Sequence, residues 1–409
     1  MKNKTLLALA ALMSLSAYAD VGPQFTILLR QEKSNKVYYS KAEMPDLESS
    51  DSFDGKYFKI VKGKGKEAIR FDEKNEELLL KAANTYYHLN KARDFWVNDI
   101  QSDVAATLPK MIVRVEISNQ YDDLGHFAHD NRTPQFNNAL TIPEGETPTW
   151  VPADKQDKWG KEIWFRPMKK ILTSELGPMG PNPLTQGLMA LERPLLDYTE
   201  NQFNRRLMEQ FFYPSYVSRP LHEDVIRYVG TLAIMKVLIF GSKQADRLFI
   251  DKWYYLDTAM LPEIAYHEYA HVVLSDKLAM SHSTPMNEGM ADYFAAVQSG
   301  KRKVYGKVPG YSNAAPKDTQ EKRKYTHWDE SNRFATADFT LSVLWDVRET
   351  LGAEVGDKVV YQARNYLKTE TSTISDGLLR AILRACEDKC PEPRNDKYKL
   401  YQTFLRKGF

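Results

Sequence analysis

Residues 265–273 read AYHEYAHVV and place two of the eight histidines of the chain four residues apart, at His267 and His271. Residues at this spacing project from one face of an α-helix, so both imidazoles can reach one metal ion. Glu268 follows the first histidine, where a carboxylate can act as a base beside the metal. Roughly 0.01 chance matches to this pattern are expected in such a chain. The stretch therefore predicts a helix with two Zn²⁺ ligands and a general base rather than a coincidental core helix.

A catalytic zinc site needs a third protein ligand and keeps one position open for water. The candidates downstream of the motif are His282 and Glu288. The metzincin extension of the motif requires glycine at position 274 and histidine at position 277. The chain has Leu274 and Lys277 there, so this extension is absent.

The segment NEGMAD at 287–292 favours Glu288 as the third ligand. Glu288 and Asp292 are again four residues apart, on a second expected helix. Glu288 can complete a His₂Glu ligand set, while Asp292 can accept the free ring N–H of a zinc-bound histidine and fix its tautomer. Structural zinc sites usually close the tetrahedron with four protein ligands, so three ligands and a free carboxylate favour a catalytic site.

HEYAH at 267–271 followed by NEGMAD at 287–292 resembles the gluzincin metallopeptidases, and in particular their thermolysin-like and fungalysin-like branch. Weaker likenesses to fungalysin-like enzymes cover ANTYYHLN at 83–90 and LWDVR at 344–348. The specific part of the resemblance spans less than a tenth of the chain, and the weaker matches extend it from about residue 76 to the end.

The resemblance implies an α+β fold, a two-lobed zincin-like peptidase with a mixed, β-rich N-terminal lobe, a helical C-terminal lobe and one catalytic zinc ion between them. It assigns the zinc ligands as His267, His271 and Glu288, the general base as Glu268, and the partner of His267 as Asp292. In such an enzyme zinc activates a water and polarises the scissile carbonyl, while the base takes a proton and returns it to the leaving amine.

The tetrahedral intermediate also needs a hydrogen-bond donor, which thermolysin-like enzymes take from a histidine and a tyrosine outside the zinc motif. His327 is the only histidine downstream of Glu288, and its position in chain order suits this catalytic role. An exposed loop histidine is the alternative for His327, and Tyr325 or Tyr311 could serve as the donor instead.

The first 19 residues have the features of a secretory signal peptide. Lys2 and Lys4 precede an apolar run that ends at the small-x-small site Ala17-Tyr18-Ala19. We therefore expect a secreted or periplasmic mature chain from Asp20 onward, with no integral membrane segment. The formal charge is +2, and removal of the two lysines with the signal segment leaves zero. No global field favours nucleic acid or an anionic membrane, and the expected partner is a peptide or protein substrate.

The hydrophobic periodicity predicts strands early and helices late in the chain. Strands are expected at 25–29, 37–39, 57–61, 68–71, 111–117 and 162–168, and a helix is expected over 75–98. Pro- and Gly-rich stretches at 141–152 and 177–183 predict surface loops. The later helices are expected at Val225–Phe240, Pro262–Ser275, Asn287–Val297, Ala335–Leu351, Asp357–Leu367 and Ser375–Cys386, the first of them buried.

These elements predict four parts of the chain. The parts are a signal peptide at 1–19, a small β-rich segment at 20–75, the N-terminal lobe of the catalytic domain at 76–265 and a helical C-terminal lobe at 266–409. An active site is expected between the lobes. A peptide substrate is expected to add a strand to an exposed sheet edge, for which Glu162–Met168 is the candidate.

The two cysteines, three further histidines and the acidic residues add little to the functional prediction. Cys386 and Cys390 are expected to form a disulfide that closes a short loop and stabilises little. His126 and His129 are expected in a polar surface loop, and His88 in a packed core. Calcium sites are common among gluzincin peptidases, but none can be placed here, because the D-x-[DN]-x-[DN]-G loop pattern does not occur.

Two alternatives to a secreted zinc endopeptidase are a zinc aminopeptidase and a zinc-binding protein without activity. Gluzincin aminopeptidases carry a Gly-x-Met-Glu-Asn element, and the nearest similar segment here, GPMGP at 177–181, lacks the glutamate. Glu268 disfavours the inactive protein, because a structural site has no use for a free carboxylate beside the metal.

Overall fold

The computed structural model shows a mixed α+β protein. It describes residues 23–30, 37–63, 65–117, 139–142, 161–166, 169–172, 253–275, 285–306, 333–367 and 374–409, together with residues 229–231, 233–234, 236–238, 240, 308, 311–312 and 317–319. The chain divides into two compact units. The first comprises Met1–Phe127, Asn137–Met168 and Asp257–Phe409, and the second comprises Ala128–Phe136 and Lys169–Leu256.

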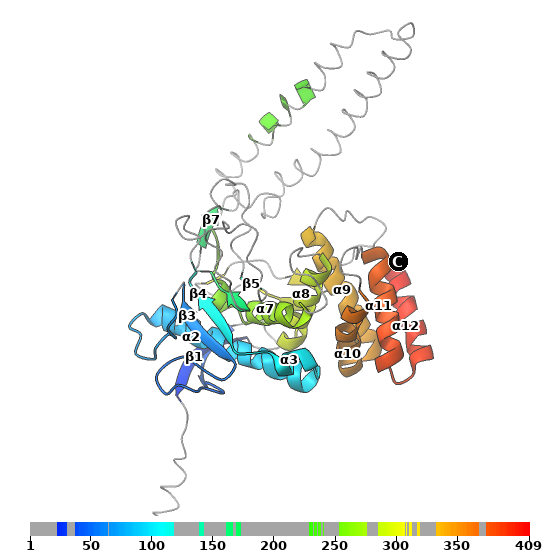
Figure 1. Cartoon of the computed structure of the whole chain (residues 1–409). Coiled ribbons are helices and arrows are strands. Elements are labelled where there is room, and N and C mark those ends of the chain that lie inside the picture. The colour runs from blue at the N-terminus through cyan, green and yellow to red at the C-terminus, as the bar shows by residue number, and fades with distance from the viewer. Residues whose placement is uncertain are drawn as a thin grey trace, which may run out of the picture. The chain divides into compact units, whose positions relative to one another are not determined.

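A four-stranded mixed sheet is the largest of the described sheets in the first unit (Figure 1). Its strands, in spatial order, are β3 (Phe58–Lys62), β4 (Met111–Val115), β6 (Glu162–Trp164) and β5 (Leu140–Ile142). The first three strands are parallel, and β5 pairs antiparallel with β6 at the end of the sheet. Most of the side chains of β3, β4 and β6 are buried, as is usual for parallel strands covered on both faces.

Two expectations about this sheet are wrong. Residues 162–164 do not form an edge, because β6 lies between β4 and β5, where the buried Glu162 carboxylate binds Arg114 at 2.6 Å. That ion pair lets a charged residue occupy an internal strand. Thr141 is not in a surface loop, because it lies in β5 and is buried. The edge strand of the described sheet on this side is therefore β5.

The N-terminal hairpin of β1 (Gln24–Arg30) and β2 (Val37–Glu43) is anchored on helix α2 (Glu76–Asp94). The Leu28 N–H donates to Asn84 Oδ1 at 3.0 Å, and His88 Nε2 lies 2.8 Å from the Leu28 carbonyl oxygen. His88 is buried, so its expected place in a packed core is confirmed. The strand expected at 68–71 is wrong, because Ala68 and Arg70 form only isolated bridges.

Helix α2 begins at a side-chain cap, since Asn75 Oδ1 accepts the Leu78 N–H at 3.1 Å. Glu76 and Glu77 in its first turn favour the same end through the helix dipole. The helix continues into a π-helical turn, η1 (Phe95–Asp99), so helical structure covers the range expected for 75–98 except Asn75, which caps it. A short helix, α3 (Asp103–Thr107), follows.

Helices dominate the rest of the first unit. After the 3₁₀ turn η5 (Thr258–Met260), they are α7 (Pro262–Leu274), α8 (Pro285–Ser299), α9 (Arg333–Leu351), α10 (Ala353–Ala363), α11 (Ile374–Lys389) and α12 (Pro393–Lys407). Figure 1 shows α7 and α8 side by side and α9 to α12 gathered at the C-terminal end. Helix α12 is absent from the sequence-based expectation, although Pro393 at its start and Gly408 in the left-handed region at its end (φ 94°) mark its limits.

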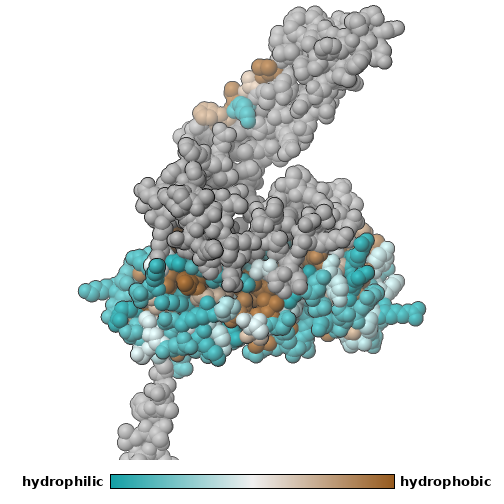
Figure 2. Space-filling view, in the orientation of Figure 1, coloured by the Kyte–Doolittle hydropathy of each residue, from teal (hydrophilic) through white to brown (hydrophobic). Residues whose placement is uncertain are grey.

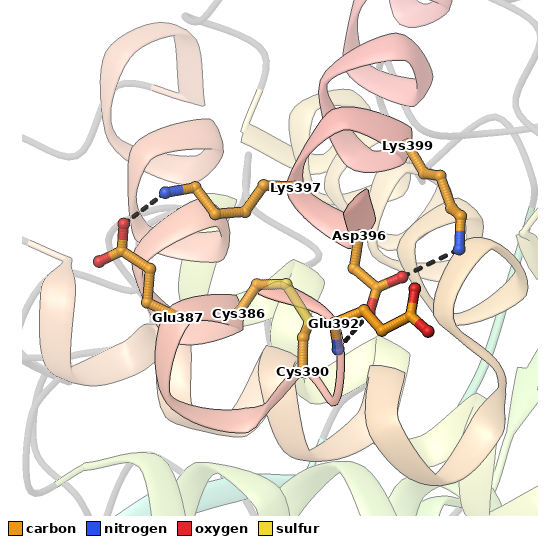
Figure 3. The surroundings of a disulfide bond; sticks show 7 residues. All are labelled: Cys386, Glu387, Cys390, Glu392, Asp396, Lys397 and Lys399. Carbon is orange, nitrogen blue, oxygen red and sulfur yellow. Dashed lines mark hydrogen bonds and ion pairs between the residues drawn. A yellow bond between two sulfur atoms is a disulfide. The ribbon is translucent and has the colours of Figure 1, made fainter. Parts of the chain in front are cut away.

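Cys386 and Cys390 form the expected disulfide at the corner between α11 and α12 (Figure 3). The Cys390 N–H also donates to the Cys386 carbonyl oxygen at 2.9 Å, which continues the last helical turn. Lys397 on α12 pairs with Glu387 on α11 across the same corner. The disulfide therefore closes a corner that other contacts already hold.

The second unit contains the antiparallel strands β7 (Lys169–Leu172) and β8 (Trp253–Leu256) and the described helical residues at 229–240. The expectation that this helix is buried is wrong, because Val237 is 68% exposed and Phe240 is 64% exposed. Figure 2 shows the described residues of this segment as mostly hydrophobic. An apolar sequence indicates that a segment favours apolar surroundings, but it does not identify the surface that the segment contacts. Among the described helices, none is long and apolar enough to cross a membrane.

Candidate metal centre

Helix α7 brings His267 and His271 to one face, one turn apart. Their Nε2 atoms lie 2.9 Å from each other, with the rings nearly perpendicular at 89°. Glu288 in the first turn of α8 places its Oε2 3.6 Å from His267 Nε2. The three residues offer ligand atoms that all lie within 4.8 Å of one another, so they could hold a metal ion.

The spacing of these atoms fits a small tetrahedral ion. Zinc–nitrogen and zinc–oxygen bonds of roughly 2.1 Å put neighbouring tetrahedral ligands about 3.4 Å apart. The distances of 2.9 Å and 3.6 Å lie on either side of this value. Two imidazoles and one carboxylate form a donor set that suits zinc and similar transition metals better than calcium or magnesium.

The other ring nitrogen of each histidine is held by a polar side chain of α8. His267 Nδ1 lies 2.9 Å from Asp292 Oδ1, and His271 Nδ1 lies 3.1 Å from Asn287 Oδ1. An oxygen acceptor at Nδ1 favours the proton there, so in the neutral form of each ring Nε2 can offer its lone pair to a metal ion. Asn287 was not singled out in the sequence, although it directly precedes Glu288 in the NEGMAD segment.

A glycine lets α8 approach α9 beside the candidate ligand Glu288. A Cβ at Gly289 would lie 2.4 Å from Thr340 Cβ and 2.9 Å from the Ala337 carbonyl oxygen of α9. Contacts this short do not occur in folded proteins, so only glycine permits this approach. The glycine of the NEGMAD segment therefore positions the third candidate ligand through helix packing.

Glu268 is buried and is held by β5. Thr141 Oγ1 lies 2.8 Å from Glu268 Oε2 and 2.9 Å from the Glu268 carbonyl oxygen, so its hydroxyl can donate to either. This contact links the sheet edge to the middle of α7. Thr141 could not be recognised from sequence, because the prolines and the glycine that follow it favour a loop.

The electrostatics of the group favour a cation between the ligands. Burial alone lowers the pKa of His267, but Asp292 and Glu288 outweigh burial and raise this pKa to about 10. Burial and the charge on His267 lower the pKa of His271 to about 4. Burial opposes ionisation of Glu288, yet the two histidines bring its pKa down to about 2. The carboxylates thus stabilise one positive charge at the position where a metal ion would lie.

Glu268 has a different environment from Glu288. Burial raises the pKa of Glu268 to about 7, against opposing effects of His267 and the Thr141 hydrogen bond. A general base is most effective when its pKa is near the working pH. Glu268 can therefore both take and return a proton near neutral pH.

Two residues outside the two motifs complete the surroundings of Asp292. Tyr305, directly after β9 (Lys303–Val304), donates its hydroxyl to Asp292 Oδ1 and lies 3.0 Å from His267 Nδ1. Lys317, the first residue of β10 (Lys317–Asp318), lies 2.6 Å from Asp292 Oδ2. Neither residue belongs to a recognised sequence motif. Both reach the site from the β9–β10 hairpin, which follows α8 in the chain.

The structure thus brings His267, Glu268, His271, Glu288 and Asp292 together. The expected donor His327 lies outside the described residues, as do its alternative Tyr325, the rejected ligand candidate His282, and His126 and His129. These assignments stay predictions. The described contacts of the other alternative donor, Tyr311, are with Asp257, Val308 and Tyr39.

No known protein-family profile matches this chain, and no curated protein is significantly similar to it. The functional interpretation therefore rests on the residues of the site and on their contacts.

Proposed function

We propose that this protein is a zinc-dependent endopeptidase of the gluzincin type. His267, His271 and Glu288 would hold the zinc ion, and Glu268 would be the general base. The observation that carries the proposal is the convergence of three ligand side chains from α7 and α8, beside a buried carboxylate that is not one of them. A site with a purely structural metal would not require that carboxylate.

The proposal includes the architecture and the location of the protein. The mixed sheet with α2 would form one lobe of a zincin-like fold, and the C-terminal helices would form the other. The features of residues 1–19 support a secreted or periplasmic protein, an environment in which the Cys386–Cys390 disulfide would persist.

Zinc, when bound, supplies a Lewis acid that polarises the scissile carbonyl and acidifies water. The chain supplies the proton transfers. Glu268 takes a proton from the attacking water and gives it to the amine that leaves. The Thr141 hydroxyl at Oε2 fixes the carboxylate, which leaves Oε1 as the oxygen for proton transfer. The Nδ1 contacts of both histidines keep their rings oriented without taking part in the transfer.

Strand β5 is the part of the described sheet best placed to hold a peptide substrate. It ends the sheet on this side, so one of its backbone edges can pair with an added strand. Thr141 lies on β5 and contacts Glu268, so a peptide paired with β5 would run beside the base. This proposal replaces the expected edge at residues 162–168, because residues 162–164 pair with a strand on both sides.

Hydrolysis of a mixed peptide library, read by mass spectrometry, tests the proposed reaction. Zinc-loaded wild type is compared with zinc-loaded Glu268→Gln, after metal analysis shows equal zinc content in both. We expect internal cleavages by the wild type and a loss of at least about a thousandfold in the variant, because the base contributes to both proton transfers.

Other outcomes would identify a different function. Removal of single N-terminal residues by the wild type would indicate an aminopeptidase. Bound zinc with no cleavage by either protein would contradict the enzyme and indicate a zinc-binding protein on a peptidase scaffold. Equal cleavage by both proteins would exclude Glu268 as the base.

A further inference from the structure

The β9–β10 hairpin carries an unusual backbone conformation next to the candidate metal centre. Tyr305 has φ of 62°, in the left-handed region that residues other than glycine, asparagine and aspartate seldom adopt. Such a conformation costs free energy and persists only where the surroundings hold it in place. The side chain held in this way is the one whose hydroxyl reaches both Asp292 and His267.

Lys317 approaches the same carboxylate from the neighbouring strand. Its Nζ lies 2.6 Å from Asp292 Oδ2 and 3.4 Å from Asp338 Oδ1 on α9, and 5.7 Å from the centre of the Tyr305 ring. The lysine therefore bridges α8 and α9 at the level of Asp292. Lys317 pairs with Val304, the residue directly before Tyr305, so the hairpin brings the two side chains to the same place.

Both oxygens of Asp292 are thus engaged from the hairpin. Asp292 is 0% exposed, and a buried carboxylate needs hydrogen bonds or an opposite charge to stay ionised. Oδ1 accepts from Tyr305 and contacts His267 Nδ1, while Oδ2 pairs with Lys317. The orientation of Asp292, and through it the ring of His267, is determined by contacts from outside the two zinc motifs.

We propose that Tyr305 and Lys317 are positioning residues for the metal centre, acting together through Asp292. We name this pair the β9–β10 clasp. The clasp holds the Asp292 carboxylate in the one orientation that fixes His267 with Nε2 toward the metal. It rests on the proposed metal site, and it adds Tyr305 and Lys317, which lie outside the two zinc motifs, to the residues that determine metal affinity.

Two effects of Lys317 on metal affinity oppose each other. Its positive charge repels a bound cation, which by itself weakens binding. Its ion pair with Asp292 fixes a histidine partner, and loss of such partners typically weakens metal binding about 10–100-fold. Because the lysine charge is offset by Asp292 at 2.6 Å and by Asp338, we expect the positioning effect to dominate.

The test measures zinc dissociation constants by competition with a chromophoric chelator, using the full chain. Tyr305→Phe and Lys317→Met are each expected to weaken zinc binding about tenfold, and Lys317→Arg is expected to recover most of the loss. Tyr366→Phe and Lys358→Met serve as matched controls, since they remove a hydroxyl and an ammonium that contact Asp388 and Glu354 elsewhere. The controls are expected to bind zinc like the wild type.

A double-mutant cycle distinguishes action through Asp292 from general damage to the fold. If the clasp acts through Asp292, the double variant Asp292→Asn/Tyr305→Phe should bind zinc less than about twofold more weakly than Asp292→Asn alone. If the two residues act independently, the fold-changes in the zinc dissociation constant would multiply. Cobalt absorption spectra give a second readout, since Tyr305→Phe and Asp292→Asn should shift the bands in the same direction. Because Tyr305→Phe removes only a hydroxyl group, it is expected to fold, and it suffices for the test if Lys317→Met does not fold.

Unchanged zinc affinity in both clasp variants would overturn the inference. Tighter zinc binding by Lys317→Met would also overturn it, as would fold-changes that multiply in the double-mutant cycle. These measurements need no peptide turnover. A zinc-replete wild type that shows the expected couplings but cleaves no peptide would therefore refute the proposed enzyme and leave the clasp. A wild type that binds no zinc would refute both.

Discussion

His88 joins three elements through its two ring nitrogens. It lies on α2, and its Nε2 contacts the Leu28 carbonyl oxygen of β1, while its Nδ1 lies 2.8 Å from the Tyr266 hydroxyl of α7. This arrangement uses the neutral ring, with Nε2–H as donor and Nδ1 as acceptor. Burial accordingly lowers the pKa of His88 to about 4.

This pKa predicts a loss of stability in mild acid. Because the folded-state pKa lies below the unfolded value of about 6.5, the unfolded chain binds more protons between these pH values, and stability falls as the pH falls. The expected loss from His88 is about 2 kcal/mol between pH 7 and pH 5. Urea unfolding of the wild type and His88→Gln at both pH values measures it. An equal acid loss in the two proteins would contradict the neutral buried ring.

At the scale of elements, the packing of α8 on α9 depends on Gly289. We expect Gly289→Ala to destabilise the protein by about 1–3 kcal/mol, because the added methyl group has no space between Thr340 and the α9 backbone. The displacement of α8 should also weaken zinc binding through Glu288. Thermal unfolding and zinc titration measure the two effects.

Gly230→Ala is the matched control, since a Cβ there meets nothing within 4 Å and helical alanine is favoured over glycine. It should leave the melting temperature and zinc affinity unchanged or slightly raised. A Gly289→Ala protein as stable as this control would show that α8 and α9 are farther apart than described.

Elements that carry a strong local signal could be predicted from sequence. Helices α7 and α8 follow from the i,i+4 pattern of ligands and apolar residues, and α9 and α11 from their periodicity. The order of strands could not be predicted, because pairing depends on partners far along the chain. The internal position of β6 depends on Arg114 neutralising Glu162, a contact between residues 48 apart. Thr141 was missed for the same reason, since nothing in its neighbours reveals that Glu268 lies beside it.

For the whole molecule, we expect zinc to raise thermal stability. A ligand that binds only the folded state stabilises it by about 3–4 kcal/mol when present at 100–1,000 times its dissociation constant. The candidate ligands come from α7 and α8, both largely buried, so the gain should extend to global unfolding. Melting curves with zinc, with a chelator and with magnesium as control measure it. His271→Gln should abolish the zinc effect, and an undiminished shift in that variant would place the metal elsewhere.

The candidate site combines contacts of very different range along the chain. The three candidate ligands lie within 22 residues of sequence on two successive helices, whereas the Thr141 hydroxyl comes from 127 residues before Glu268, the side chain that it contacts. The proposed metal binding and the proposed proton transfer therefore depend on parts of the chain that lie far apart in sequence. If the proposed function is right, substitutions in β5 would reduce hydrolysis while the two helices still bind zinc.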